Sequence, residues 1–122
     1  MPSYVRVYTG DDGKSHIEDF QPPFEPFVDT EGAHGVGTPI ENASGFTIRR
    51  SAPDYFLDYH TAPRRQYTVT LSGQIEVSTG DGTVRRCGPG DVLLAEDLTG
   101  EGHTTRVVGG EPRVYLVIPL AD

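Results

Sequence analysis

Two histidines occupy positions from which a side chain could take up and release protons. His60 follows Asp58 by two residues, and His103 comes shortly after Glu96 and Asp97. A histidine in a partly dry cavity titrates near neutral pH, and a nearby carboxylate orients its second ring nitrogen. Pairing of His60 with Asp58, or of His103 with Glu96 or Asp97, therefore predicts general acid and base catalysis.

A metal site is the alternative for the same residues. Alternate residues of a strand share a face, so Asp58 and His60 point the same way. With His103 they would form a set of two histidines and one carboxylate, which suits iron, manganese, nickel or zinc. Gln66 could add its amide oxygen, but it brings no charge, and a metal held by His60, His103 and Gln66 would be weakly bound or absent. A carboxylate at position 96 or 97 could complete the set instead.

Polar side chains alternate along the segment 66–72. Gln66 and Thr68 lie on one face with Thr70 and Ser72, and apolar or aromatic residues lie on the other. This polar face meets either a wet pocket, where Thr68 would contact a ligand, or bulk water.

Arg64, Tyr59 and Glu96 are candidates for binding a substrate. The planar guanidinium of Arg64 could hold a carboxylate or an enolate through two hydrogen bonds. A solvated loop holding acidic neighbours is the alternative for Arg64 and Arg65. Tyr59 could stack on a ligand, although packing in the core or at an interface suits it as well as it suits Tyr55 and Phe56.

Short strands separated by glycine turns must position these side chains. The separators Ser-Gly, Gly-Asp-Gly, Gly-Pro-Gly-Asp and Gly-Gly have the composition of tight turns. Eight such strands at this spacing indicate an all-β sandwich or jelly roll. The expected strands are Phe46–Arg50, Tyr55–His60, Gln66–Ser72, Gln74–Ser78, Thr83–Cys87, Val92–Glu96, His103–Val108 and Val114–Leu120.

The first 44 residues differ in character from the rest. Tyr4–Tyr8 alternates β-forming residues and predicts an edge strand or one exchanged with a second subunit. Residues 20–42 contain four prolines and several glycines, which exclude a helix or an inner strand. We expect residues 1–44 to form this strand and an irregular arm pinned by Phe20, Phe24 and Phe27, and residues 45–122 to form the barrel.

Composition restricts the class of partner and the compartment. The 122 residues suit one domain, and the net charge of -8, with nine arginines and one lysine, argues against a nucleic-acid partner. Cys87 is the one cysteine, so no intrachain disulfide can form, and its position predicts packing rather than nucleophilic chemistry. The absence of an export signal or a long apolar run predicts a soluble, cytoplasmic protein with no membrane association.

The stretches YHTAPRRQYTVTLSG and GPGDVLLAEDLTGEGHTTRVV resemble the two sequence motifs of the cupin superfamily, small double-stranded β-helix barrels. On that resemblance His60 takes the place of the first metal-binding histidine and His103 the place of the last. Ala62 stands where the family has its second histidine, and Gln66 where it has a glutamate. The resemblance thus implies a jelly-roll barrel with a degenerate metal-ligand set.

The resemblance also implies a site in the barrel mouth and a homodimer paired through sheet edges or exchanged N-terminal strands. His16 could line that mouth, whereas His34 lies outside the motifs. The leading hypothesis is an isomerase-type or lyase-type enzyme of small organic acids or carbonyl compounds, with His60, His103 and Gln66 as catalytic residues. The rivals are a metal-dependent oxygenase or isomerase and a non-catalytic small-molecule binder.

Overall fold

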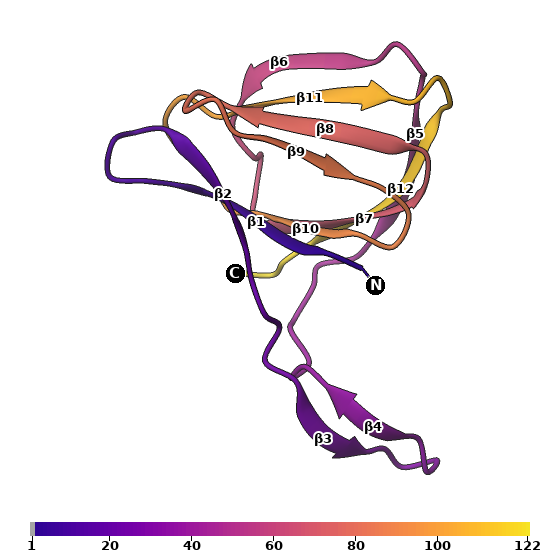
Figure 1. Cartoon of the computed structure of the whole chain (residues 1–122). Helices are drawn as coiled ribbons and strands as arrows, with labels where there is room; N and C mark the ends of the chain where they lie inside the picture. Colours follow the sequence, from indigo (N-terminus) through magenta and orange to yellow (C-terminus); the bar gives the residue numbers. More distant parts are fainter. Residues whose placement is uncertain (1) are drawn as a thin grey trace.

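The computed structural model describes residues 2–122, and every regular element in that range is a β-strand. Two sheets lie face to face, and a small hairpin stands away from them (Figure 1). No helix in this range is long and apolar enough to cross a membrane. The strands are β1 (Tyr4–Thr9), β2 (Ser15–Asp19), β3 (Glu25–Val28), β4 (His34–Gly37), β5 (Thr47–Ser51), β6 (Phe56–His60), β7 (Gln66–Ser72), β8 (Gln74–Thr79), β9 (Val84–Cys87), β10 (Val92–Ala95), β11 (His103–Val108) and β12 (Arg113–Pro119).

The larger sheet has six strands in the order β2-β1-β10-β7-β12-β5, and the smaller has four in the order β6-β11-β8-β9. The apolar core is one part of the space between them, and it includes Val5, Val7, Ile75, Val77 and Val107. Cys87 belongs to this cluster at 2% exposure, and burial raises the pKa of its thiol. The expectation that Cys87 serves packing is therefore confirmed.

The polar face of β7 turns inward. Gln66, Thr68 and Thr70 are buried, while the residues between them are half-buried. Polar side chains line this part of the interior. The two sheets enclose a cavity there, and the apolar core does not extend through it. The choice between a wet pocket and bulk water is settled in favour of the pocket.

The sequence predicts most strands of the two large sheets to within one or two residues, and it misses β2. The antiparallel partner of β1 is β2, and β1 also pairs in parallel with β10. The prediction of an edge position for Tyr4–Tyr8 is wrong, because β2 takes the edge. The charged sequence His16-Ile17-Glu18-Asp19 gave no strand signal.

The arm leaves the sheets after Asp19 and contains the separate hairpin β3-β4 (Figure 1). Pro26 can lie within β3 because this strand pairs on one side only. The ring centroids of Phe20 and Phe24 lie 6.1 and 6.2 Å, respectively, from that of Tyr4. These two residues therefore hold the arm to the sheet. Phe27 instead covers the glycines of β4 and stays 41% exposed.

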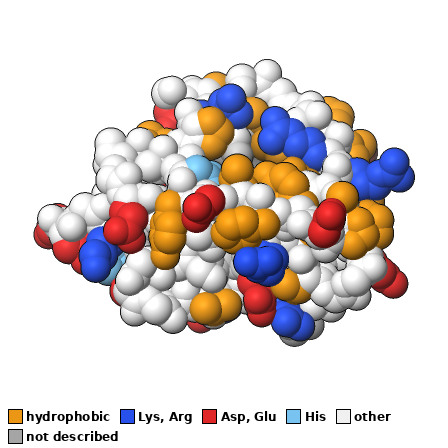
Figure 2. Space-filling model, turned by 90° about the horizontal axis from the view of Figure 1, so that it is seen from above, with side chains coloured by type: hydrophobic (Ala, Val, Ile, Leu, Met, Phe, Trp, Pro, Cys, Tyr) orange, Lys and Arg blue, Asp and Glu red, His pale blue; other side chains and the backbone are white. Residues whose placement is uncertain are grey.

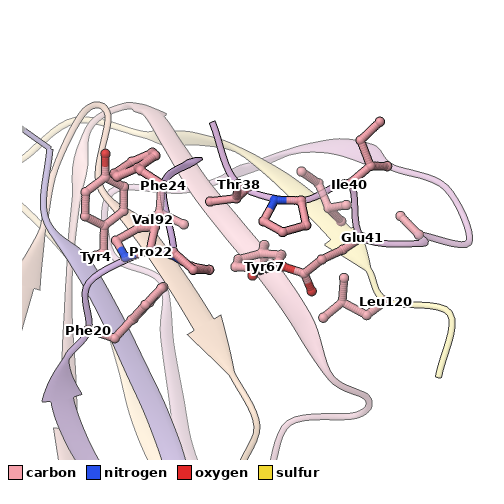
Figure 3. A pocket seen from close by; sticks show the side chains of 14 residues that line it. Tyr4, Phe20, Pro22, Phe24, Thr38, Ile40, Glu41, Tyr67, Val92 and Leu120 are labelled. Carbon is pink, nitrogen blue, oxygen red and sulfur yellow. Dashed lines mark hydrogen bonds between the residues drawn. The ribbon is translucent and has the colours of Figure 1, made fainter. Parts of the chain in front are cut away.

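A groove of about 450 Å³ lies between this arm and the outer face of the larger sheet (Figure 3). Tyr4, Phe24, Ile40 and Leu120 give it a largely apolar lining. At its side the hydroxyl of Tyr67 donates a hydrogen bond of 2.6 Å to Glu41. Burial and this carboxylate raise the pKa of Tyr67 to about 12, so the phenol stays protonated.

Candidate functional site

A second cavity, of about 190 Å³, lies between the two sheets and contains the polar residues of the sequence motifs. Its walls come from β5, β6, β7, β8, β10, β11 and β12 together with the loop after β6. His60, His103, Gln66 and Thr68 all line it. The expectation that residues from distant strands converge here is met, while their chemical roles remain predictions.

His60 and His103 form a close pair at one end of the cavity. Their ring centroids lie 4.4 Å apart, and the residues are directly opposite in the β6-β11 ladder. Gly102 permits this approach: its φ is 82°, and a Cβ there would lie 2.1 Å from the carbonyl oxygen of His60. A side chain at position 102 would therefore push the two histidines apart.

The ring of His60 is held by a backbone carbonyl. Its Nδ1 lies 2.8 Å from the carbonyl oxygen of Asp58, so Nδ1 carries a hydrogen and Nε2 keeps its lone pair. Burial lowers the pKa of this ring, and the charge of the neighbouring His103 lowers it further. At neutral pH the His60 ring is thus an uncharged proton acceptor.

His103 is held by a buried carboxylate. Its Nδ1 lies 2.6 Å from Oδ2 of Asp97, and the hydroxyl of Ser15 donates to the same oxygen at 2.6 Å. Ser15 and Asp97 are both completely buried, and His103 is 5% exposed. This carboxylate fixes Nδ1 as the donor and leaves Nε2 free. Ser15 was missed because the sequence gave no sign of β2.

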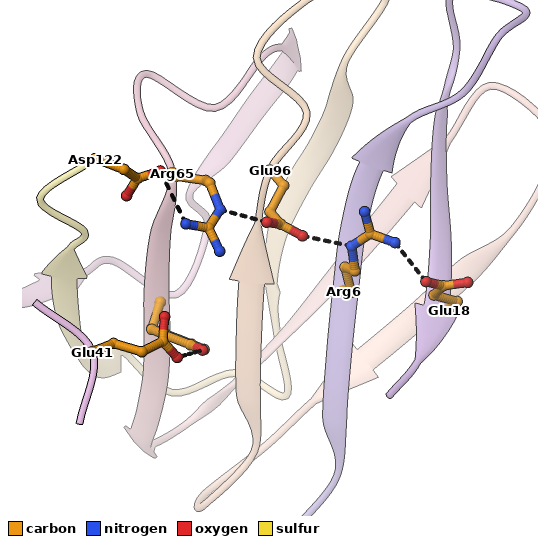
Figure 4. Close-up of polar contacts among 7 residues, drawn as sticks. Arg6, Glu18, Glu41, Arg65, Glu96 and Asp122 are labelled. Atoms are coloured by element: carbon orange, nitrogen blue, oxygen red, sulfur yellow. Dashed lines mark hydrogen bonds and ion pairs between the residues drawn. The ribbon is translucent and has the colours of Figure 1, made fainter. Parts of the chain in front are cut away.

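Glu96 and Asp97 are adjacent, and only Asp97 faces inward. Glu96 lies on the outer face, where it accepts hydrogen bonds of 2.5 Å from Arg6 and Arg65 (Figure 4). It does not line the cavity. The prediction that Glu96 binds substrate or pairs with His103 is wrong, because adjacent side chains at the end of β10 point to opposite sides.

The loop before β7 supplies a contact to Gln66. Nη1 of Arg64 donates to Oε1 of Gln66 at 3.2 Å, from an exposed position that does not line the cavity. Arg64 therefore orients the amide and does not clamp a substrate directly. Since the amide oxygen of Gln66 is engaged, its NH₂ group is free to donate into the cavity.

Two further candidates lie elsewhere. Tyr59 is 50% exposed and does not line the cavity. His16 is placed between Asp12 and Asp81, at 3.0 and 3.3 Å, and the hydrogen bond to Asp12 raises its pKa. It does not line the cavity either, because β2 is the outermost strand of its sheet. Neither residue is positioned to touch a substrate there.

The residues present do not fit a divalent metal. Asp58 is exposed and accepts the backbone N–H of Tyr59, so it does not join the histidines. Residues 2–122 contain no group of three or more His, Cys, Asp or Glu that could hold a metal ion. His60, His103 and Gln66 supply neutral donors only, and the amide oxygen already contacts the Arg64 guanidinium. Two imidazoles and one amide that is already engaged are too few donors, with no carboxylate to offset the charge of a dication taken out of water.

The sequence gave no sign of Arg113. It lies at the start of β12, is 5% exposed and lines the same cavity. Its Nε and Nη2 donate to Oγ1 of Thr70 at 3.1 and 3.0 Å, and its guanidinium lies 4.0 Å from the centroid of the Tyr115 ring. The expected strand began one residue later, which left Arg113 in a turn.

Solved structures with similar folds are known. A protein with a double-stranded β-helix domain from Klebsiella pneumoniae is 25% identical, with a TM-score of 0.51 over 66% of this chain and 70% of that one. The polyketide cyclase RemF from Streptomyces resistomycificus is 17% identical, with a TM-score of 0.54 over 97% of this chain and 75% of that one. The chain has the cupin fold.

An RmlC-like cupin protein from Desulfovibrio desulfuricans is also similar, at 23% identity over 66% of this cupin and 76% of that protein, with a TM-score of 0.45. Comparison of the sequence with protein-family models and with curated proteins gives no match. The function of this cupin must therefore be argued from its own cavity.

Proposed function

We propose that this cupin binds a small organic acid or carbonyl compound between its sheets and moves a proton on it, with His60 and His103 as the acid and base. The supporting observation is the histidine pair itself. Each ring has its Nδ1 engaged by a fixed acceptor, and the two rings lie 4.4 Å apart beside a cavity. Two imidazoles arranged in this way can share one proton and pass it to a bound molecule.

The roles of the two rings follow from their different partners. His60 is the base, because burial lowers its pKa and leaves Nε2 unprotonated at neutral pH. His103 is the acid, because its Nδ1 is held by the buried carboxylate of Asp97 and its Nε2 is left to carry the transferred proton. A carbonyl oxygen near Gln66 would accept a hydrogen bond from the free amide NH₂ as negative charge develops on it.

The reaction begins at a carbon next to that carbonyl. A C–H bond breaks, the proton goes to Nε2 of His60, and the electron pair forms an enolate. In a conjugated substrate, return of the proton to the γ-carbon gives an isomer. Attack of the enolate carbon on a second carbonyl closes a ring, and His103 donates a proton to the alkoxide that forms. RemF, which shares the fold, is a polyketide cyclase, and this supports carbonyl substrates as the class to test first. No step requires a metal.

Deuterium exchange tests the proposal without knowledge of the natural substrate. We expect the protein to accelerate exchange of the α-hydrogens of acetophenone or benzoylacetone in D₂O, followed by NMR. His60→Gln and His103→Gln should each lower the catalysed rate about 100-fold, the size usual for loss of a general acid or base. His34→Gln is the matched control, because His34 is exposed on the arm. Exchange that survives both cavity substitutions, or that is lost on dialysis against a chelator, would contradict the proposal.

We also propose that the arm packs against a second copy of the chain. The hairpin β3-β4 forms a separate two-stranded sheet, which is marginally stable alone in water. Val28, Val36 and Ile40 are 80, 62 and 98% exposed. A homodimer would cover them, and Val36→Ser should shift the mass measured by light scattering toward the monomer. An unchanged mass would exclude the arm as the interface.

A further inference from the structure

Arg113 is a charged side chain buried without a counter-ion. Within residues 2–122, its guanidinium has no carboxylate at ion-pair distance, whereas each of Arg6, Arg65, Arg85 and Arg86 has one. Burial lowers the pKa of Arg113 to about 10, so it is still charged at neutral pH. A buried charge with no partner destabilises a fold, which calls for a functional reason.

The neighbours of Arg113 leave part of its hydrogen-bonding capacity unused. A guanidinium has five N–H donors, and Thr70 accepts from Nε and Nη2 through one oxygen. The Tyr115 ring covers one face of the guanidinium plane. Both contacts fix the orientation of the group, and neither neutralises its charge.

One other polar group of the cavity also lacks a partner among residues 2–122. The hydroxyl of Thr68 is buried, lines the cavity and has no hydrogen-bond partner among residues 2–122. Thr68 lies on β7 between Gln66 at the histidine end and Thr70 at the arginine end. Gln66 and Thr70 are separated by about 13 Å along the strand, at 3.3 Å per residue. The cavity thus has a proton-transfer end, a free hydroxyl and a cationic end in one row.

We propose that Arg113 binds the anionic group of the substrate, so that the substrate is an elongated organic anion whose carboxylate or enolate lies at the arginine end and whose reacting carbonyl lies at the histidine pair. This proposal rests on the proposed function for the reacting end, and it names the substrate class that the same cavity accepts. It also moves the anion clamp from Arg64, which lies outside the cavity, to Arg113. The carboxylate supplies the counter-ion that Arg113 lacks, through two parallel hydrogen bonds.

A matched pair of ligands tests the charge preference. Hydrocinnamate and its amide have the same shape and differ in the anionic group, and their affinities can be measured by calorimetric titration. We expect the protein to bind the carboxylate at least 10-fold more tightly than the amide, the fold-change that corresponds to one charge-assisted hydrogen bond of about 1.4 kcal/mol. Equal affinities, or no binding of either compound, would overturn the proposal.

Substitutions show which residue causes the preference for the carboxylate. Arg113→Met keeps the length of the side chain and should abolish the preference, because the affinity for the carboxylate falls to that for the amide. Arg113→Lys keeps the positive charge but loses the paired N–H donors of the guanidinium, so it should retain part of the preference for the carboxylate. This variant serves as the test if Arg113→Met does not fold. Arg49→Met is the control, because Arg49 also lines the cavity but is exposed. A preference that persists in Arg113→Met, or that disappears in Arg49→Met alone, would contradict the assignment.

The two proposals fail separately. The variant with both His60→Gln and His103→Gln should keep the preference for the carboxylate, because Arg113 is untouched. A carboxylate preference without deuterium exchange supports the anion site and contradicts the acid and base roles. Exchange of neutral ketones without a carboxylate preference supports the acid and base roles and contradicts the anion site.

Discussion

The outer face of the larger sheet and the cavity between the sheets differ in whether their charged groups are paired. On the outer face, Glu18, Arg6, Glu96, Arg65 and Asp122 form a continuous chain in which each charge meets its opposite (Figure 4). Within residues 2–122, the cavity contains a cation, Arg113, with no counter-ion and a hydroxyl, that of Thr68, with no hydrogen-bond partner. Satisfied charges stabilise the fold, and unsatisfied ones inside a cavity indicate where a ligand completes the structure.

The side of the molecule that carries β6 differs from both regions, because apolar and charged side chains are mixed on its surface. Apolar side chains are exposed there among arginines and carboxylates (Figure 2). Phe56, Leu57 and Tyr59 of β6 are 43, 41 and 50% exposed. Leu57 also lines the cavity, so this strand forms one wall of the site.

The neighbours Asp97 and Glu96 give the largest contrast between inside and outside. Asp97→Ala leaves His103 and Ser15 unpaired in a dry interior, and we expect the free energy of unfolding to fall by about 2 to 4 kcal/mol. Glu96→Ala breaks two partly exposed ion pairs, and the expected loss is about 1 kcal/mol. Urea unfolding at pH 7 measures both. Equal losses would mean that the buried hydrogen bonds of Asp97 contribute no more to the free energy of unfolding than the partly exposed ion pairs of Glu96.

Two arginines should respond in opposite directions. Arg113→Met removes a buried charge that has no counter-ion, so we expect stability to stay unchanged or to rise by about 1 kcal/mol. Arg65→Met breaks the contacts with Glu96 and Asp122, and we expect a loss of about 0.5 to 1 kcal/mol. Thermal unfolding of the two variants in parallel checks this. A large loss in Arg113→Met would assign Arg113 a structural role.

Acidification should weaken the outer chain of charges. Burial alone would raise the pKa of Glu96, but the hydrogen bonds from Arg65 and Arg6 outweigh it and lower the pKa below the ordinary 4.5. The stabilisation by Glu96 is therefore complete above the unfolded pKa and is lost as the pH falls through the folded pKa. Urea midpoints between pH 7 and pH 3 should fall less in Glu96→Gln than in the unaltered protein. Parallel curves would show that Glu96 contributes nothing.

The sequence predicts the sheets better than it predicts the site. Glycine turns and alternating residues fixed β7 and β11 to the residue, because local chemistry determines turns and strand faces. The resemblance to the cupin motifs also placed His60, His103 and Gln66 in one cavity. Ser15 and Arg113 were missed because nothing local distinguishes a buried serine or arginine from an exposed one. Their burial depends on contacts with residues distant in sequence: Ser15 donates to Asp97, and β12 pairs with β5 and β7.

The Nε–H signals of Arg113 and Arg65, observed by ¹⁵N NMR, test the central claim most directly. Both hydrogens are held, one by Thr70 and the other by Glu96, and arginine-to-lysine variants assign the two signals. Addition of hydrocinnamate should shift the Arg113 signal in a saturable manner and leave the Arg65 signal in place. A shift of both signals, or of neither, would contradict the central claim. That claim is that Arg113 in the cavity binds an organic anion, whereas Arg65 on the outer face is already paired with carboxylates.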